Sequence, residues 1–357
     1  MKMPVRILLV LLCAALILSL PFTVSAPNML NDVKMELMNE EGDEEEIDFG
    51  RLFFSTACAE EAEEITEEED LDTTDTADTA EAFDPVSKYV LPLDFSVPPA
   101  PKAELYTENG YEDETISVKL EHQEMDDGTK IHVAYVKIAD PSQLRTGVSN
   151  PERIATTRTK SVSTLAKAYN AVVAMNGDNY TDAPKKTSFE YRMTTKIRSK
   201  ENKTKDILII DNKGDFHLFI KSEGLKDFPD QMKREGLLLV NAFTFGPALV
   251  KDGELMNLDA TYNYNPNGRE PRAAIGQTGP LSYVMVIIEA KDRSGKSGFS
   301  HKKLAEFMYE ELKCVQAFNL DGGNSAEMVF GDQVIKGMRG GDERGLSDII
   351  YFATAKP

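Results

Sequence analysis

Pairs of strand-like segments joined by tight turns dominate the middle of this chain and favour a sheet-rich fold. Apolar and polar residues alternate over 115–122 and 130–138, on either side of Asp126-Asp127-Gly128. Alternation with a period of two buries one face of a strand, and a turn of Asp and Gly reverses the chain. The sequence therefore predicts an antiparallel hairpin here and in two similar places. These are 206–211 with 216–220 around Asn212-Lys213-Gly214, and 273–277 with 281–290 around Thr278-Gly279-Pro280.

Two helical patterns interrupt the strands, over 161–169 and 301–313. Their apolar residues recur at intervals of three and four, as on one face of an α-helix. Each helix leads into a short apolar strand, 171–175 and 315–320. Hairpins combined with helix-to-strand units predict an α+β fold, a mixed and mainly antiparallel β-sheet domain with a few packed helices.

Both helix-to-strand units end in a loop rich in Asn, Asp and Gly. The first reads Ala174-Met-Asn-Gly-Asp-Asn-Tyr180 and the second Phe318-Asn-Leu-Asp-Gly-Gly-Asn-Ser325. Polar residues at the carboxyl ends of strands, on glycine-rich loops, are where such scaffolds usually place binding and catalytic groups. The same residue types also form turns where nothing binds, so a purely structural role stays open for each loop.

The negative charge of the chain is concentrated before the strand-rich part. The formal net charge is −20, and residues 31–84 alone hold 22 Asp or Glu against two basic residues, Lys34 and Arg51. Such a segment buries too little apolar area to offset the entropy of ordering it, so we expect a solvated spacer, with calcium capture by its carboxylates as the alternative. The remainder is nearly neutral, which argues against a nucleic-acid partner.

The first 26 residues have the features of an export signal. Lys2 and Arg6 precede an apolar stretch, and Val24-Ser25-Ala26 offers small residues for cleavage. Residues 7–23 are also apolar enough for a membrane tether, so the predicted location is secreted or on the extracellular face of the membrane. The three cysteines leave only Cys314 in the strand-rich part, which excludes an internal disulfide or a zinc finger there.

The motifs of the strand-rich part, taken in order, resemble those of the phosphodiester glycosidase family, which includes exported bacterial proteins. The most specific is Asn319-Leu-Asp-Gly-Gly-Asn-Ser325, within a resemblance that covers roughly residues 150–357. The resemblance implies hydrolysis of a sugar 1-phosphodiester, with N-acetylglucosamine the best-known sugar of the family. The other motifs are Ala174-Met-Asn-Gly-Asp-Asn-Tyr180, Phe245-Gly-Pro-Ala-Leu-Val-Lys-Asp-Gly253, Pro271-Arg-Ala-Ala-Ile-Gly-Gln277 and Arg344-Gly-Leu-Ser-Asp348.

With this resemblance, the expected organisation has four parts. Residues 1–26 are a signal peptide or membrane anchor, and 27–85 a disordered acidic linker. Residues 86–149 are an N-terminal β-hairpin region, either accessory or part of the same sheet, and 150–357 are the phosphodiester glycosidase domain. The stretch 185–192 departs from the family pattern, which puts substrate contacts from that stretch in doubt.

A sugar phosphodiester requires a cationic clamp for its phosphate and carboxylates for its anomeric carbon. Arg suits the phosphate because its planar fork donates two parallel hydrogen bonds. Cleavage of the sugar C1–O bond passes through an oxocarbenium-like transition state that a carboxylate pair serves, so Asp321 and Asp178 are the predicted catalytic residues. Asp321 is expected to act as base or nucleophile. The predicted substrate-binding residues are Asn176, Gly177, Arg272, Asn319, Gly322, Gly323, Asn324, Ser325 and Arg344.

Several alternatives stay open at this level. Glu327 is a third candidate carboxylate, although it can also face solvent from the strand 326–330. The partner implied by the resemblance is a phosphate-linked glycan, and no cofactor or metal site is predicted. Two other functions compete: a non-catalytic module that binds phosphorylated glycans, and a phosphodiesterase that uses Asp178 and Asp321 as ligands for Ca²⁺ or Mg²⁺.

Overall fold

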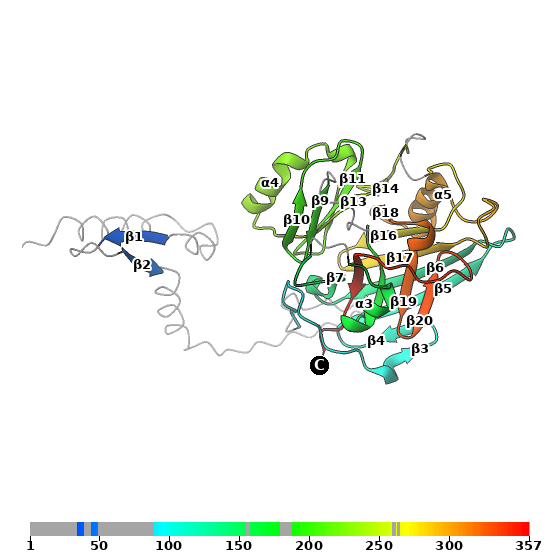
Figure 1. Cartoon of the computed structure of the whole chain (residues 1–357), viewed down its shortest axis with the longest axis horizontal. Coiled ribbons are helices and arrows are strands. Elements are labelled where there is room, and N and C mark those ends of the chain that lie inside the picture. Colours follow the sequence, from blue (N-terminus) through cyan, green and yellow to red (C-terminus); the bar gives the residue numbers. More distant parts are fainter. Residues whose placement is uncertain are drawn as a thin grey trace, which may run out of the picture. The chain divides into compact units, whose positions relative to one another are not determined.

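The protein is described by a computed structural model for residues 34–38, 44–48, 89–154, 158–178, 188–258, 262 and 265–356. It forms two compact units, Met1–Thr79 and Ala80–Pro357. In the first unit, β1 (Lys34–Met38) and β2 (Glu44–Asp48) pair antiparallel, within the acidic segment for which the sequence predicts no regular structure (Figure 1). The predicted signal at 1–26 and the possible tether at 7–23 lie outside the described residues.

The second unit consists of three sheets in which the named strands pair antiparallel, as Figure 1 shows. This confirms the predicted α+β class with mainly antiparallel sheets. The nine-stranded sheet has the order β15 (Glu254–Leu255), β14 (Ala248–Lys251), β18 (Gln316–Leu320), β16 (Arg272–Gly279), β17 (Ser282–Glu289), β6 (Lys130–Ile138), β5 (Ile116–Glu124), β4 (Gly110–Glu112) and β3 (Tyr106–Thr107). One five-stranded sheet has the order β20 (Gln333–Lys336), β19 (Glu327–Phe330), β8 (Val173–Asn176), β21 (Asp348–Phe352) and β7 (Leu144–Val148). The other has the order β10 (Thr195–Ser199), β9 (Phe189–Arg192), β13 (Leu239–Phe245), β11 (Asp206–Asp211) and β12 (Phe216–Phe219).

All three predicted hairpins are present, as β5–β6, β11–β12 and β16–β17. The first of them lies outside the region of family resemblance, yet it belongs to the same sheet as the third. Strand β6 pairs with β17 along its whole length, from Lys130 opposite Glu289 to Lys137 opposite Ser282. The amino-terminal hairpin is therefore a structural part of the nine-stranded sheet.

Helices form at both predicted places. The first is α3 (Val162–Ala168), whose amino end is capped by Ser161, with Oγ accepting from the Thr164 amide at 3.3 Å. The second begins as α5 (His301–Glu306) and continues as a π-helical turn over Phe307–Glu311. The remaining helical segments are α4 (Phe228–Arg234) and the 3₁₀ turns Ala103–Leu105, Pro141–Gln143, Ile220–Ser222, Leu225–Asp227 and Gly323–Ser325.

A central hydrophobic core receives side chains from all three sheets, and each α-helix covers another face of one sheet. Phe318 of β18, Met175 of β8 and Phe243 of β13 lie in the central core and are fully buried. On the faces turned away from this core, helix α5 packs against the nine-stranded sheet, helix α3 packs against β8 and β19, and helix α4 packs against β11 and β13. The strands that carry the predicted site residues are thus packed on both faces, which holds their ends in place.

Among the described helices, none is long and apolar enough to cross a membrane.

Candidate active site

The two Asn–Asp–Gly loops come from different sheets, and the side chain of Asn176 joins them. This side chain is fully buried at the end of β8. Its Nδ2 donates to the carbonyl of Asp321 at 2.8 Å and to that of Gly177 at 3.0 Å, while its Oδ1 accepts from the amide of Glu327 at 3.1 Å. Because these bonds engage both ends of the amide, Asn176 positions the second loop from inside the protein.

Gly177 is required by the close approach of the last strand. The amide of Gly177 donates to the carbonyl of Asp348 at 3.3 Å. A Cβ atom on Gly177 would lie 2.3 Å from Oδ2 of Asp348, far inside van der Waals contact. A side chain at this position would therefore push the Asp348 carboxylate away, and only Gly lets β8 and β21 meet in this way.

Asp178 is buried, with 1% of its side chain exposed. Its Oδ1 accepts from Nη2 of Arg192 at 2.6 Å, and its Oδ2 accepts from the amide of Thr244 at 2.9 Å. Both oxygens are thus engaged by protein donors. The sequence predicts a catalytic Asp178, whereas in the folded chain this carboxylate is part of an internal network, and direct contact with substrate would require its partners to move.

The network centres on Arg192, which is fully buried at the end of β9. Nε of Arg192 donates to Oδ2 of Asp348 at 2.7 Å, and its Nη1 lies 3.4 Å from Oε2 of Glu190 and donates to the carbonyl of Ala242. The guanidinium also stacks over the ring of Phe243, with Cζ 4.0 Å from the ring centroid. One cation therefore ties together two carboxylates that come from separate family motifs.

Three buried carboxyl groups surround this single guanidinium, so they cannot all ionise without cost. Burial and the neighbouring Asp178 raise the pKa of Glu190 well above its usual value. Burial raises the pKa of Asp348 to about 6, although Arg192 opposes the shift. A hydrogen bond between the side chains of Glu190 and Asp178 acts in the same direction on the pKa of Glu190, so the protonated form of Glu190 is favoured.

Sequence reasoning did not single out Arg192 and Glu190, because both lie in or next to the stretch that departs from the family pattern. A signal was present, however. Two motif aspartates on buried-looking strands need a cation, and Arg is the side chain that most readily supplies one inside a protein.

The second loop lies closer to solvent. Asp321, Gly322 and Gly323 are partly exposed, and the loop packs on the residues that precede β16. The amide of Gly323 donates to the carbonyl of Pro271 at 2.9 Å, and a Cβ on Gly322 would lie 2.8 Å from the same oxygen. Asp321 follows Leu320, the partner of Ala273, so its main chain comes next to that of Arg272 where the two strands meet.

Arg272 is next to this loop, but its guanidinium binds protein acceptors. Nε donates to the carbonyl of Phe299 at 3.0 Å, Nη2 to that of Asn265 at 2.7 Å, and Nη1 to Nε2 of His301 at 2.9 Å. Burial lowers the pKa of Arg272 to about 10 and that of His301 to about 3, so the imidazole is neutral and can accept this bond. Arg272 thus differs from the expected phosphate clamp: it anchors the loop around Asn265 instead of presenting a fork to solvent.

Asn319 is buried one residue before the tip of β18. Its Nδ2 donates to the carbonyl of Gly246 at 2.8 Å, which ties the cis Gly246-Pro247 turn to the loop. Its Oδ1 has no partner among the described residues. The family motif around Gly246 therefore contacts the most specific motif directly.

Asn324 and Arg344 line a cavity of about 370 Å³, and Ser325 lies behind Arg344. Nη1 of Arg344 donates to Oγ of Ser325 at 2.8 Å, and Arg293 approaches Oδ1 of Asn324 at 3.4 Å. Three cationic side chains, Arg293, Lys336 and Arg344, line this cavity together with Asp342 and Glu343. Of the cavities found in the described part of the chain, this one brings predicted substrate-binding residues together with positive charge.

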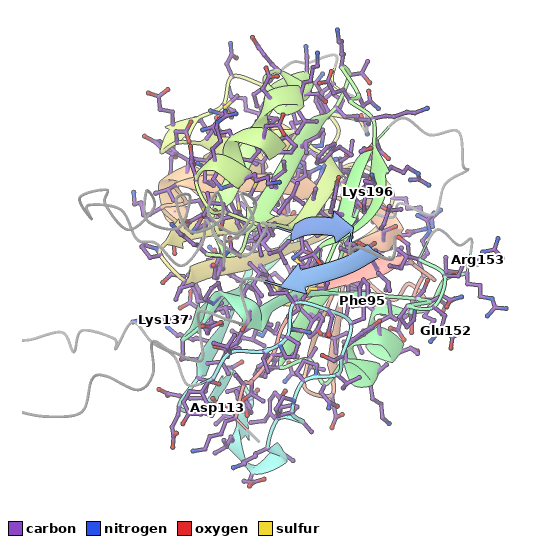
Figure 2. All side chains as sticks on the ribbon, turned by 90° about the vertical axis from the view of Figure 1, so that its left-hand side faces the viewer. Phe95, Asp113, Lys137, Glu152, Arg153 and Lys196 are labelled. Atoms are coloured by element: carbon purple, nitrogen blue, oxygen red, sulfur yellow. The ribbon has the colours of Figure 1, made fainter. Side chains whose placement is uncertain are left out.

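The basic stretch Lys196–Lys205, which follows the departure from the family pattern at 185–192, contributes no residue to the lining of this cavity. Lys196 lies on β10, the outer strand of its sheet, and is exposed (Figure 2). Within the described residues, no group of three His, Cys, Asp or Glu side chains is placed to hold a metal ion.

Comparison with known proteins identifies one family. A family model for the phosphodiester glycosidases matches residues 169–353, which include both loops, Arg192, Arg344 and Asp348. The chain is 29% identical over 113 residues to a Bacillus subtilis protein described as SPbeta prophage-derived uncharacterized protein YomE, a match that covers 32% of this chain and only 17% of that protein.

Two solved structures resemble the fold. The catalytic domain of zebrafish N-acetylglucosamine-1-phosphodiester alpha-N-acetylglucosaminidase, auto-inhibited by its pro-peptide, aligns with a TM-score of 0.51 and 16% identity, over 67% of this chain and 83% of that one. A hypothetical protein from Synechocystis aligns with a TM-score of 0.46 and 16% identity, over 67% and 62% of the two chains.

Proposed function

Because the chain belongs to the phosphodiester glycosidase family, we propose that it hydrolyses a sugar 1-phosphodiester of the N-acetylglucosamine 1-phosphodiester type. The proposed substrate is a phosphate-linked glycan of the cell envelope or extracellular space, in keeping with the predicted export signal. Water cleaves the bond between the anomeric carbon and the phosphate oxygen, which releases a free sugar and a phosphomonoester.

The observation that carries this proposal is the position of the cationic cavity beside the most specific family motif. A phosphodiester is an anion, and Arg293, Lys336 and Arg344 gather positive charge where Asn324 and Ser325 offer hydrogen bonds. In this proposal, Arg344 and Arg293 hold the phosphate by charge-assisted hydrogen bonds. The flexible backbone of Gly322 and Gly323 lets the substrate approach closely.

Asp321 is the carboxylate assigned to the anomeric carbon. It is partly exposed at the start of the loop whose Asn324 lines the cavity, whereas both oxygens of Asp178 are engaged inside the protein. We therefore assign Asp178 a positioning role, with Arg192 and Asp348, that holds the first loop against β9, β13 and β21. Asp321 acts as nucleophile or base on the substrate.

The test uses the full chain with N-acetylglucosamine 1-(methyl phosphate), with and without a chelator. The wild type should release N-acetylglucosamine and methyl phosphate, and Asp321→Asn should release both at least about 100-fold more slowly. Asp332→Asn, in the exposed β19–β20 turn, is the matched control and should act like the wild type.

Three outcomes would overturn the proposal. Tight binding of the diester with no turnover would indicate a binding module. Activity of the wild type that is lost when the chelator is added would indicate a metal-dependent phosphodiesterase. Full activity of Asp321→Asn would show that Asp321 is not the catalytic carboxylate.

A further inference from the structure

Hydrolysis of a glycosidic bond generally uses two carboxyl groups, one of which has a raised pKa and exchanges a proton. The proposed function supplies one of them, Asp321. Asp178, the expected second group, is held by Arg192 and the Thr244 amide. The second carboxyl group must therefore come from another residue near the motif loop and the cavity.

Glu327 is the buried acidic residue nearest in sequence to the motif loop. It is the first residue of β19 and 2% exposed, so it does not face solvent as one sequence-based alternative allowed. The amide of Asn176 bridges the main chains of Glu327 and Asp321, at 3.1 and 2.8 Å. Asp321 and Glu327 thus lie at the two ends of the motif loop, and the side chain of Asn176 joins these ends.

The side chain of Glu327 forms a hydrogen bond with that of Glu343, which lies on the wall of the cavity. Glu343 is exposed, and its two oxygens accept from Oγ of Ser163 at 2.8 Å and from the Ser163 amide at 3.3 Å, at the start of α3. Unlike the buried Asp178, it can exchange one of these bonds for the substrate at the surface. A hydrogen bond between two carboxyl groups requires a proton on one of them, so this pair holds one proton between its members. The pair therefore holds an exchangeable proton one side chain away from the cavity.

The pKa values of the two carboxyl groups shift in opposite directions because their surroundings differ. Burial, followed by the contact with Glu343, raises the pKa of Glu327 to about 8, while Lys336 opposes the shift. Burial alone would raise the pKa of Glu343, but the hydrogen bonds from Glu327 and Ser163 lower it below its usual value. Other charged groups near the pair are Arg293, Asp342 and Arg344 on the cavity wall.

We propose that the Glu327–Glu343 pair is the acid/base of the reaction, with Glu343 in contact with the substrate and Glu327 positioning and protonating it. This inference rests on the proposed function and adds a residue pair to it. Glu327 is a positioning residue in this scheme, because it acts through Glu343.

The reaction balances in two steps. The Asp321 carboxylate bonds to the anomeric carbon as the bond to the phosphate oxygen breaks, and that oxygen keeps the electron pair and takes the proton of the pair. Water then bonds to the anomeric carbon, its proton passes to Glu343, and the ester to Asp321 breaks with its electrons returning to the carboxylate. The net result is one water consumed, with one sugar and one phosphomonoester released.

The decisive variant is Glu343→Gln, assayed with N-acetylglucosamine 1-(methyl phosphate) with and without azide. Removal of a general acid/base should lower kcat by roughly 100- to 1,000-fold. Azide attacks the glycosyl-enzyme without base assistance, so it should restore turnover and yield glycosyl azide, which a merely structural role would not produce.

Glu327→Gln tests the positioning residue separately. Gln retains a hydrogen bond to Glu343 and mimics the protonated acid in shape, so folding should survive. Without the shared proton, the basic limb of the kcat/KM profile should move to lower pH by about one unit or more. Glu327→Asp should recover part of the wild-type profile.

The outcomes separate the two proposals. Absence of turnover by the wild type overturns the proposed function and the acid/base assignment with it. Two results overturn the acid/base assignment alone, provided that the wild type turns over. One is full activity of Glu343→Gln, and the other is a loss of activity in Glu343→Gln that azide does not restore.

Discussion

The two Asn–Asp–Gly loops are similar in sequence, yet the fold treats their aspartates differently. Asp178 is buried with both oxygens engaged by Arg192 and the Thr244 amide, whereas Asp321 is partly exposed at the start of a loop whose Asn324 lines a cavity with three cationic side chains. The first loop is a structural support and the second borders the proposed reaction site. The comparison shows that the residue types of a loop do not determine its role; the segments that pack against it do.

The largest expected difference between the loops concerns the cation assigned to each. Arg192→Ala would leave three buried carboxyl groups without their cation, so the free energy of unfolding should fall by about 3–5 kcal/mol. Urea unfolding of the variant measures this. Arg344→Ala is the matched control, since Arg344 is exposed, and should change stability by no more than about 0.5 kcal/mol. Equal destabilisation by both variants would contradict the distinction between the loops.

The two aspartates should separate activity from stability. Asp321→Asn is expected to lower turnover of the sugar phosphodiester by about 100-fold or more while the urea midpoint stays near that of the wild type. Asp178→Asn should lower the midpoint as well, because it weakens the ion pair with Arg192. Steady-state kinetics and urea unfolding of the same preparations check this. If Asp178→Asn lost activity at unchanged stability, Asp178 would be catalytic after all.

Glycines in the two loops offer a smaller contrast. Gly177→Ala would place a methyl group against the Asp348 carboxylate and should cost about 2 kcal/mol. Gly323→Ala meets no atom within 4 Å and only has to adopt a φ of +58°, so it should cost about 1 kcal/mol. Urea unfolding again provides the measurement. A larger cost at Gly323 would show that the second loop is the more tightly packed.

The last expected effect concerns substrate binding and not stability. Loss of the charge-assisted bonds from Arg344 should raise KM about tenfold, equivalent to about 1.4 kcal/mol, with kcat little changed. Arg344→Lys keeps the charge but not the planar fork, so its KM should lie between those of Arg344→Ala and the wild type. An unchanged KM in Arg344→Ala would remove Arg344 from the phosphate site.

The sequence predicted the elements whose evidence is local. The alternation within β5–β6, β11–β12 and β16–β17 is visible over a few residues, and each turn lies between its two strands. Strands β7 and β13 were not predicted. Strand β7 pairs with β21, about two hundred residues away, and β13 is buried on both faces and shows no alternation. Neither feature leaves a local pattern to read.

By itself, the amino-acid sequence determined the α+β class, the hairpins and the two loops that follow helix-to-strand units, because these depend on periodicity and turn residues within short windows. Only the tertiary structure decided which carboxylates lie at the cavity and which are locked inside. Burial and ion pairing at Asp178 come from Arg192 on another strand, and the Glu327–Glu343 contact joins residues of two segments. Solvation and acidity are properties of the assembled surroundings, and no local pattern encodes them.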